Sequence, residues 1–297
     1  MNIANIDQQA AMRPGMPIFP SGADKMSPPY RPIHAPQLQP QLHRSSHRLQ
    51  EYAPSRRLES HVTAYWIVDF LPVPGNPGHR VIPDGCVDIV VDLLASSSRR
   101  AAYVVGLTTQ FEVLQFAEAR SVCGIRLYSE SAHSILNAPL SAFMTHRVFL
   151  EDIWGSEALD WVEKLQAAKT NPDIIETVEQ RLCSILKDAD APAPTLVHQS
   201  MRYIYDYKGI LSVTKLADKV NFSERHLRRA FERELGLSPK EMMGIVRFQS
   251  VLQELCRGDY PSLTDLALQY GYYDHSHFSS TFTRYYGLPL KHLTKLG

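Results

Sequence analysis

The last hundred residues contain an internal repeat, which limits the possible folds more than any other feature of the chain. The two copies, residues 212–239 and 262–290, each run Ser-(Val/Leu)-Thr, Leu-Ala, an aromatic residue beside a turn, an apolar-(x3)-Phe pair, Gly-Leu and Pro. Apolar residues at helical spacing flank a turn residue that tolerates a left-handed backbone, Asn221 or Gly271. The repeat therefore predicts two helix-turn-helix units.

Helix boundaries in the first copy follow from its capping residues. Ser212 and Ser223 are good N-caps for two short helices, and Gly236 is a good terminator of the second. Pro239 is suited to the first turn of a further helix, which we expect to run to Arg257 and to join the two copies.

The second helix of each copy carries polar side chains on its outward face. In the first copy, Arg225, Arg228 and Arg229 fall at i, i+3 and i+4 and share one side of the helix. Arginine can grip guanine O6 and N7, or a phosphate, in a bidentate way. The outward face of the second copy carries neutral hydrogen-bonding side chains and one arginine: His275, Ser276, His277, Ser280 and Arg284.

Residues 197–297 resemble the double helix-turn-helix domain of AraC/XylS-type transcription regulators, through the repeat, its linking helix and the closing GYYDHSHFSSTFTRYYGLPLKHL. The resemblance implies that each second helix enters a major groove, one turn of DNA apart, with RNA polymerase as a partner and a homodimer as an assembly. Base contacts would come from Arg225, Arg228 and Arg229 in the first helix and from His275, Ser276, His277 and Ser280 in the second. Many members have a basic residue at the positions of Ser280 and Thr283, so we expect the first helix to read bases more strongly.

Residues 48–190 have the pattern of a β-rich region with trailing helices. Aromatic and β-branched residues predict a strand at 61–70, and the turn Pro83-Asp84-Gly85 predicts a hairpin between 79–82 and 86–93. Further short strands are predicted at 101–107, 111–117 and 121–128, and helices at 130–137, 156–169 and 173–187. The predicted fold class is α+β, with a β-sandwich or barrel-like domain followed by an all-α double helix-turn-helix domain.

Composition sets the remaining boundaries. Residues 1–47 hold eight of the twenty prolines, which favours a disordered tail, and DADAPAPT at 188–195 places a linker at 191–196. Residues 48–194 carry thirteen Lys/Arg against nineteen Asp/Glu, whereas residues 195–297 carry fourteen against ten. The basic end is therefore the candidate for binding double-stranded DNA. The resemblance to AraC/XylS-type regulators implies that 48–190 is a sensing or dimerisation domain that binds a small-molecule effector.

The sequence gives little support to an enzyme, a metal site or a cofactor. Four scattered cysteines lack metal-ligand spacing, and the sequence has no nucleophile elbow, Walker loop or Rossmann fingerprint. Asp84, Cys86 and Asp88 favour a hairpin turn over a catalytic cluster. We expect a cytoplasmic regulator without a membrane partner. Two alternatives stay open: a DNA-binding module fused to an enzymatic or alkylation-sensing domain, and a β-rich domain that only dimerises or binds another protein.

Overall fold

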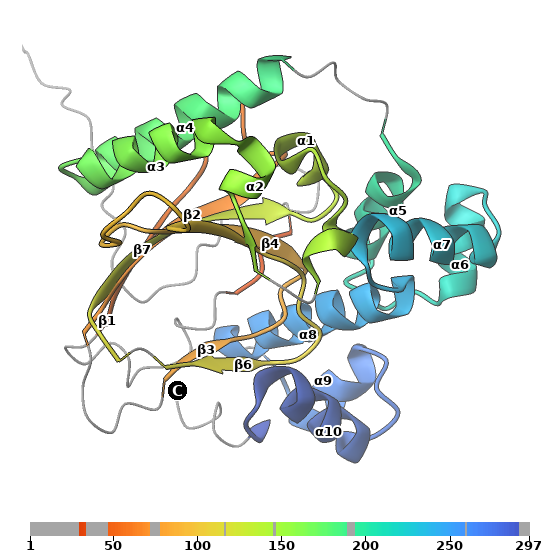
Figure 1. The fold of residues 1–297 in the computed structure, drawn as a ribbon. Coiled ribbons are helices and arrows are strands. Elements are labelled where there is room, and N and C mark those ends of the chain that lie inside the picture. The colour runs from red at the N-terminus through yellow and green to blue at the C-terminus, as the bar shows by residue number, and fades with distance from the viewer. Residues whose placement is uncertain are drawn as a thin grey trace, which may run out of the picture.

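The computed structural model describes residues 30–33, 47–71, 78–115, 117–144, 147–188, 194–258 and 260–290. A curved antiparallel sheet and its covering helices form the amino-terminal part, and a group of helices forms the carboxy-terminal part (Figure 1). Most of the predicted tail, and residues 191–193 of the predicted linker, lie outside the described residues. No helix in the described ranges is long and apolar enough to cross a membrane.

Six strands pair in the order β1-β2-β7-β4-β5-β8, and two more, β3 and β6, form a separate ribbon. The strands of the sheet are β1 (His47–Tyr52), β2 (Val62–Phe70), β4 (Cys86–Asp92), β5 (Ala102–Val105), β7 (Arg120–Tyr128) and β8 (Val148–Phe149). The ribbon consists of β3 (His79–Val81) and β6 (Glu112–Leu114). The curved sheet and the opposed ribbon (Figure 1) confirm the barrel-like expectation.

Successive side chains along β2 pack into two different apolar clusters. Tyr65 and Ile67 belong to the large hydrophobic core cluster, and the hydroxyl of Tyr65 donates to Glu179 at 3.2 Å. Trp66 and Val68 belong to a smaller apolar cluster. Gly124 of β7 is paired with Trp66, and a Cβ there would overlap the indole ring. Successive residues of a strand point to opposite faces, so this sheet is apolar on both.

The sequence predicted helices after the last long strand, and the helices that follow β7 cover one face of the sheet (Figure 1). They are α1 (His133–Leu136), the 3-10 turn η3 (Leu140–Phe143), α2 (Glu151–Trp154), α3 (Ser156–Ala167) and α4 (Asn171–Asp188). The apolar stripe of α4 is buried at Ile174, Val178 and Leu182. These residues recur at helical spacing, and packing of such a stripe stabilises a helix.

The predicted hairpin around Pro83-Asp84-Gly85 is wrong. The turn exists, with Gly85 at φ +74 and the Asp84 carboxylate accepting from the backbone N–H of Cys86 at 2.9 Å. However, β3 pairs with β6, while β4 pairs with β5 and β7. Turn chemistry fixes only the local backbone, and here the chain passes from the ribbon to the large sheet instead of folding back on itself.

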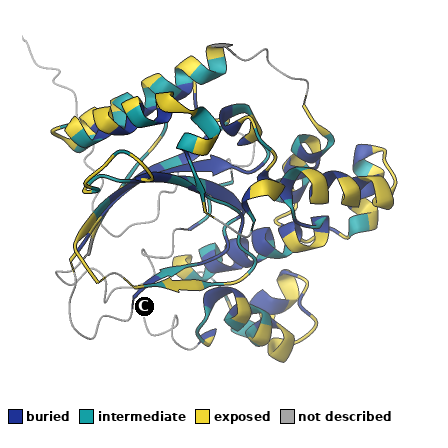
Figure 2. Ribbon diagram, in the orientation of Figure 1, coloured by how far each residue is buried: buried dark blue, intermediate teal, exposed yellow. Residues whose placement is uncertain are grey.

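Within residues 194–258 and 260–290, the structure contains six helices: α5 (Leu196–Asp206), α6 (Val213–Val220), α7 (Glu224–Leu235), α8 (Pro239–Arg257), α9 (Leu263–Gln269) and α10 (His275–Tyr286). The bounds of α8 agree with the predicted linking helix. In Figure 1, α8 lies between α5–α7 on one side and α9–α10 on the other. Figure 2 shows that α8 and the central strands carry much of the buried surface.

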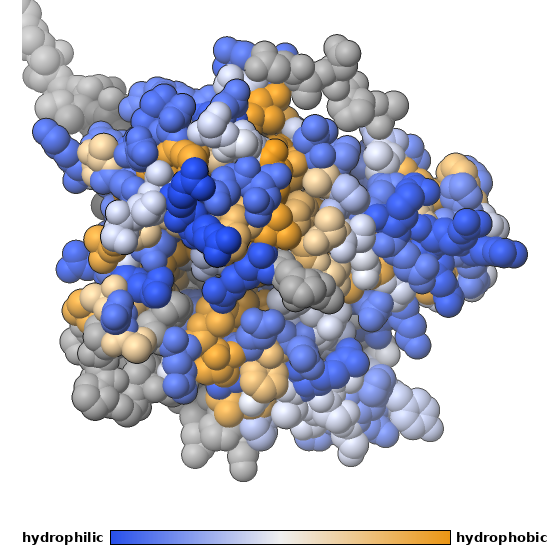
Figure 3. Space-filling view, in the orientation of Figure 1, coloured by the Kyte–Doolittle hydropathy of each residue, from blue (hydrophilic) through white to orange (hydrophobic). Residues whose placement is uncertain are grey.

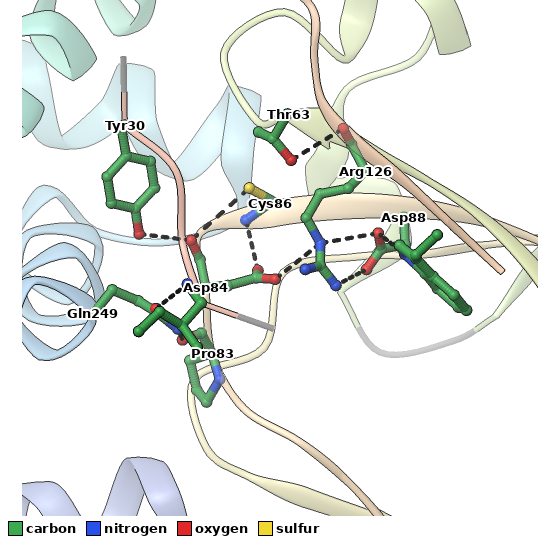
Figure 4. A network of polar contacts seen from close by, with 10 residues as sticks. Tyr30, Thr63, Pro83, Asp84, Cys86, Asp88, Arg126 and Gln249 are labelled. Carbon is green, nitrogen blue, oxygen red and sulfur yellow. Dashed lines mark hydrogen bonds and ion pairs between the residues drawn. The ribbon is translucent and has the colours of Figure 1, made fainter. Parts of the chain in front are cut away.

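Residues 30–33 correct the expectation of a disordered tail at these four positions. The side-chain oxygen of the fully buried Gln249 accepts from the N–H of Ile33 at 2.9 Å, and its amide donates to the carbonyl of Pro83 at 2.8 Å (Figure 4). The ring of Tyr30 stacks on Tyr205 of α5, with centroids 4.4 Å apart. The segment thus joins the β-rich region to α5 and α8.

A buried arginine lies beside this junction. The Nε of Arg126 lies 3.2 Å from carboxylate oxygens of both Asp84 and Asp88 (Figure 4). Burial alone would lower the pKa of Arg126, but the two carboxylates raise it above its ordinary value. Trp66 donates to Asp88 at 3.2 Å, so Asp84 and Asp88 serve a structural ion-pair network here.

Candidate nucleic-acid interface

The first helix-turn-helix unit is built by the residues that the sequence identified. The Ser212 hydroxyl accepts from the N–H of Lys215, and the Ser223 hydroxyl accepts from the N–H of His226. Asn221 adopts the left-handed conformation at φ 57 between α6 and α7. Both caps satisfy amides that have no partner within the helix.

The second unit repeats this arrangement with one more residue in its turn. Ser262 caps α9, and Gly271 takes φ +71 in the turn. The cap of α10 is Asp274, whose carboxylate accepts from the N–H of His277 at 2.7 Å. The additional residue is Tyr273, which is 86% exposed immediately before the α10 cap. Sequence analysis did not select it.

The inward faces of α7 and α10 are apolar and pack around the linking helix. Leu227 and Phe231 of α7 are buried, as are the equivalent Phe278 and Phe282 of α10. The ring of Phe248 in α8 lies 5.5 Å from that of Phe282. This packing fixes which side of each helix faces outward.

The outward face of α7 carries unpaired positive charge. Arg225, Arg228 and Arg229 are all exposed, and none forms a hydrogen bond or ion pair with another described residue. The side chains over α7 form a strongly hydrophilic area in Figure 3. Three free guanidinium groups on one face can accept a polyanion without first breaking an internal ion pair.

An aromatic pair flanks this face at its turn. Phe222 is 46% exposed, and its ring stacks on the imidazole of His226 with centroids 5.0 Å apart. Sequence analysis did not select either residue. The only signal for them was the aromatic residue beside the turn in each copy of the repeat.

The outward face of α10 differs from that of α7 in its charge and in the hydrogen bonds that its side chains form. His275, Ser276 and Ser280 are exposed. The Nδ1 of His277 accepts from the N–H of Tyr273 at 3.3 Å, so this contact requires that nitrogen to be unprotonated. The guanidinium of Arg284 donates to the Tyr285 hydroxyl at 2.8 Å and lies over its ring.

The structure therefore presents all eight predicted side chains on exposed parts of α7 and α10, in two separate groups. Among the described residues, the three arginines of α7 have no hydrogen-bond or ion-pair partner, whereas three of the five side chains on α10 form hydrogen bonds with neighbouring groups: His277, Ser280 and Arg284. No group of three or more His, Cys, Asp or Glu side chains within the described ranges could hold a metal ion.

These features define a protein with a double helix-turn-helix domain at its carboxy-terminal end. Two family models match the chain: residues 216–295 match a helix-turn-helix domain, and residues 50–149 match a domain of unknown function, DUF6597. The first match confirms the resemblance to helix-turn-helix domains of the AraC/XylS type. The second covers most of the sheet and describes no activity.

The chain matches one curated relative over only part of that relative's length. The lactose operon transcription activator of Staphylococcus xylosus is 29% identical over 96 residues, which are 31% of this chain and 34% of that protein. The chain thus matches about a third of this relative.

Solved structures resemble the chain at low similarity. The C-terminal domain of AraT, a response regulator from Geobacillus stearothermophilus, is 22% identical at a TM-score of 0.32, over 36% of this chain and 89% of that chain. ToxT from Vibrio cholerae is 10% identical at a TM-score of 0.39, over 84% of this chain and 98% of that chain. At TM-scores this low, neither likeness supports a conclusion about this chain.

Proposed function

We propose that the chain is a sequence-specific DNA-binding transcription regulator of the AraC/XylS type. The observation that carries the proposal is the exposed, unpaired arginine face of α7 within a double helix-turn-helix unit. In this proposal α7 and α10 are recognition helices that enter adjacent major grooves, about one turn of DNA apart. The basic helical part, residues 197–297, is the DNA-binding domain, and 191–196 is the linker to it.

In this proposal each predicted side chain contacts either a base or the DNA backbone. Arg225, Arg228 and Arg229 contact base edges through α7. His275, Ser276, His277 and Ser280 contact bases through α10, and Arg284 contacts the DNA backbone. Base contacts specify the site, while phosphate contacts position the protein. Tyr273 and the Phe222–His226 pair adjoin these faces and provide apolar contacts to sugars or thymine methyl groups.

The β-rich region, residues 48–190, is proposed as a sensing or dimerisation domain. Its effector would be a small molecule, and the assembly a homodimer. RNA polymerase is the partner implied by the family resemblance, and a DNA-bound regulator works in the cytoplasm. Catalysis has no part in this proposal.

The alkylation-sensing alternative receives no support from the cysteines. Burial raises the pKa of Cys86 and of Cys123, and burial also raises the pKa of the more accessible Cys256 to about 11. A raised pKa lowers the fraction of nucleophilic thiolate at neutral pH. Cys183 is only partly buried, but within the described residues it joins no metal-binding group.

Selection from a random duplex library tests the proposal. The full-length chain is incubated with the library, and bound duplexes are sequenced over several rounds. We expect an enriched motif with two half-sites about 10 base pairs apart. The triple variant of Arg225, Arg228 and Arg229 to Ala should enrich no motif, whereas the exposed control Arg57→Ala should enrich the wild-type motif. Failure of the wild-type chain to enrich any sequence would reject the proposal.

A further inference from the structure

The β-rich region contacts both recognition helices, and in each case at the carboxy-terminal end. The hydroxyl of Ser141, in η3, donates to the carbonyl of Arg233 in α7 at 2.8 Å. The Nη1 of Arg80, in β3, donates to the carbonyl of Tyr286 in α10 at 3.0 Å. Both carbonyls lie in the last turn of a helix, where no partner exists within the helix itself.

The two contacts lie beside equivalent glycines of the repeat, Gly236 and Gly287. Each recognition helix ends at a glycine with a left-handed backbone: Gly236 at φ +75 and Gly287 at φ +80. A Cβ at Gly236 would lie 2.5 Å from the Cγ of Met144, and a Cβ at Gly287 would overlap Arg80 and Phe111. The β-rich region thus approaches both helices closely at matching residues.

Each donor is itself held in place. The guanidinium of Arg80 lies 5.4 Å from the ring centroid of Phe111 and 5.7 Å from that of Tyr286. A cation at this position also interacts favourably with the negative end of the α10 dipole. Ser141 lies between Leu140 and Phe143, which are both buried. Both donors are therefore held in place within the β-rich region.

The amino-terminal ends of the recognition helices are left free. Arg225, near the start of α7, and His275, at the start of α10, are exposed. Side chains near the start of a recognition helix reach base edges in a helix-turn-helix protein. The β-rich region thus holds each helix at the end opposite to the one that would enter the groove.

We infer that Arg80 and Ser141 are positioning residues for DNA recognition, which set the distance and angle between α7 and α10 by holding both helices to the β-rich region. The inference rests on the proposed function. Helix α8 is the covalent link between the two helix-turn-helix units. The β-rich region adds a second link, so the two recognition helices belong to a closed frame that suits one half-site spacing.

The experiment measures binding of the full-length chain to four duplexes. One carries the selected site, two carry the same half-sites moved apart or together by about two base pairs, and one carries the α7 half-site alone. The variants are Arg80→Gln, Ser141→Ala and their combination. Arg80→Lys retains a donor and a charge, and Arg57→Gln is the exposed control. Thermal unfolding followed by circular dichroism confirms that each variant is folded.

We expect the combined variant to lose about tenfold of the preference for the native spacing, the order expected from losing a charge-assisted hydrogen bond. Its affinity for the single half-site should stay unchanged, and Arg80→Lys should restore part of the preference. An unchanged spacing preference in the folded combined variant would overturn the inference. An equal loss on all four duplexes would also overturn it, because it would assign the two residues a purely structural role. If the wild-type chain binds no duplex, the proposed function itself fails.

Discussion

The hydroxyl of Tyr205 donates a 2.9 Å hydrogen bond to the carboxylate of Glu130, joining α5 to the segment that follows β7. Burial raises the pKa of Glu130 from 4.5 to about 7, although hydrogen bonds from Tyr205 and Ser129 act in the opposite direction. Burial also raises the pKa of Tyr205, so its hydroxyl remains a donor throughout the neutral range. This carboxyl group is therefore protonated more readily in the folded chain than in the unfolded one.

The contribution of Glu130 to the stability of the fold should consequently decrease as pH rises. Because the folded pKa of Glu130 lies above the unfolded value, its stabilisation is complete below about pH 4.5 and is lost as pH rises through about 7. Between about pH 5 and 8, the free energy of unfolding of the wild type should fall by about 1–3 kcal/mol relative to Glu130→Gln. Urea unfolding at several pH values measures this difference. The exposed control Glu59→Gln should follow the wild type, and parallel curves for wild type and Glu130→Gln would contradict the prediction.

Single substitutions on α7 should separate base reading from phosphate binding. A lost bidentate base contact costs about 1–3 kcal/mol on the specific site and relaxes the preference at one position. Arg225→Ala, Arg228→Ala and Arg229→Ala should each weaken binding to the selected site more than to random DNA. Fluorescence anisotropy with both duplexes at one salt concentration tests this. A variant that weakens both duplexes equally has lost only a phosphate contact.

The two half-sites should contribute unequally to specificity. Free arginines lie on α7, whereas α10 offers serine and histidine side chains, and the Arg284 guanidinium is hydrogen-bonded to Tyr285. Base changes under α7 should each cost about 1–3 kcal/mol, and changes under α10 should cost less. Scanning base changes across a footprinted site measures both sets. Equal costs in the two half-sites would contradict this expectation.

Gln249 should be essential for the junction between the sheet and α8. Its side chain is fully buried and pairs with the backbone groups of Ile33 and Pro83. Gln249→Ala leaves two enclosed backbone groups without a partner, which costs about 1–3 kcal/mol for each group. Thermal unfolding should show a clear decrease in midpoint, whereas the exposed Gln269→Ala should change it little. A decrease of the same size in both variants would mean that the junction does not depend on these two hydrogen bonds.

The carboxy-terminal helices were predictable from the sequence because their signals are local. Ser212, Ser223 and Gly236 act within one turn of their own helices, so the ends of α6 and α7 follow from short stretches of residues. The strands were found, but their partners were not. The turn at Pro83–Gly85 predicts a bend in the chain, but it does not indicate with which strands β4 pairs.

The contacts between distant segments could not be predicted from the sequence. Residues 30–33 lie in a proline-rich stretch whose composition favours disorder, and nothing local indicates that Gln249 accepts the Ile33 amide. Arg80 likewise gives no local sign that it will meet the last turn of α10. Such contacts depend on the completed packing of sheet and helices, which a single sequence does not reveal.

The hydrogen bond between Ile33 and Gln249 has a consequence for biosynthesis. Its two partners are 216 residues apart along the chain. At a synthesis rate of about 5–20 residues per second, Ile33 is made about 10–40 seconds before Gln249. In the last part of this interval, after residue 190 has been made, the β-rich region is complete in sequence but lacks the helix that buries this segment. We therefore expect the nascent chain to need a chaperone or slow translation most at this stage, after the sheet has emerged and before α8 has been made.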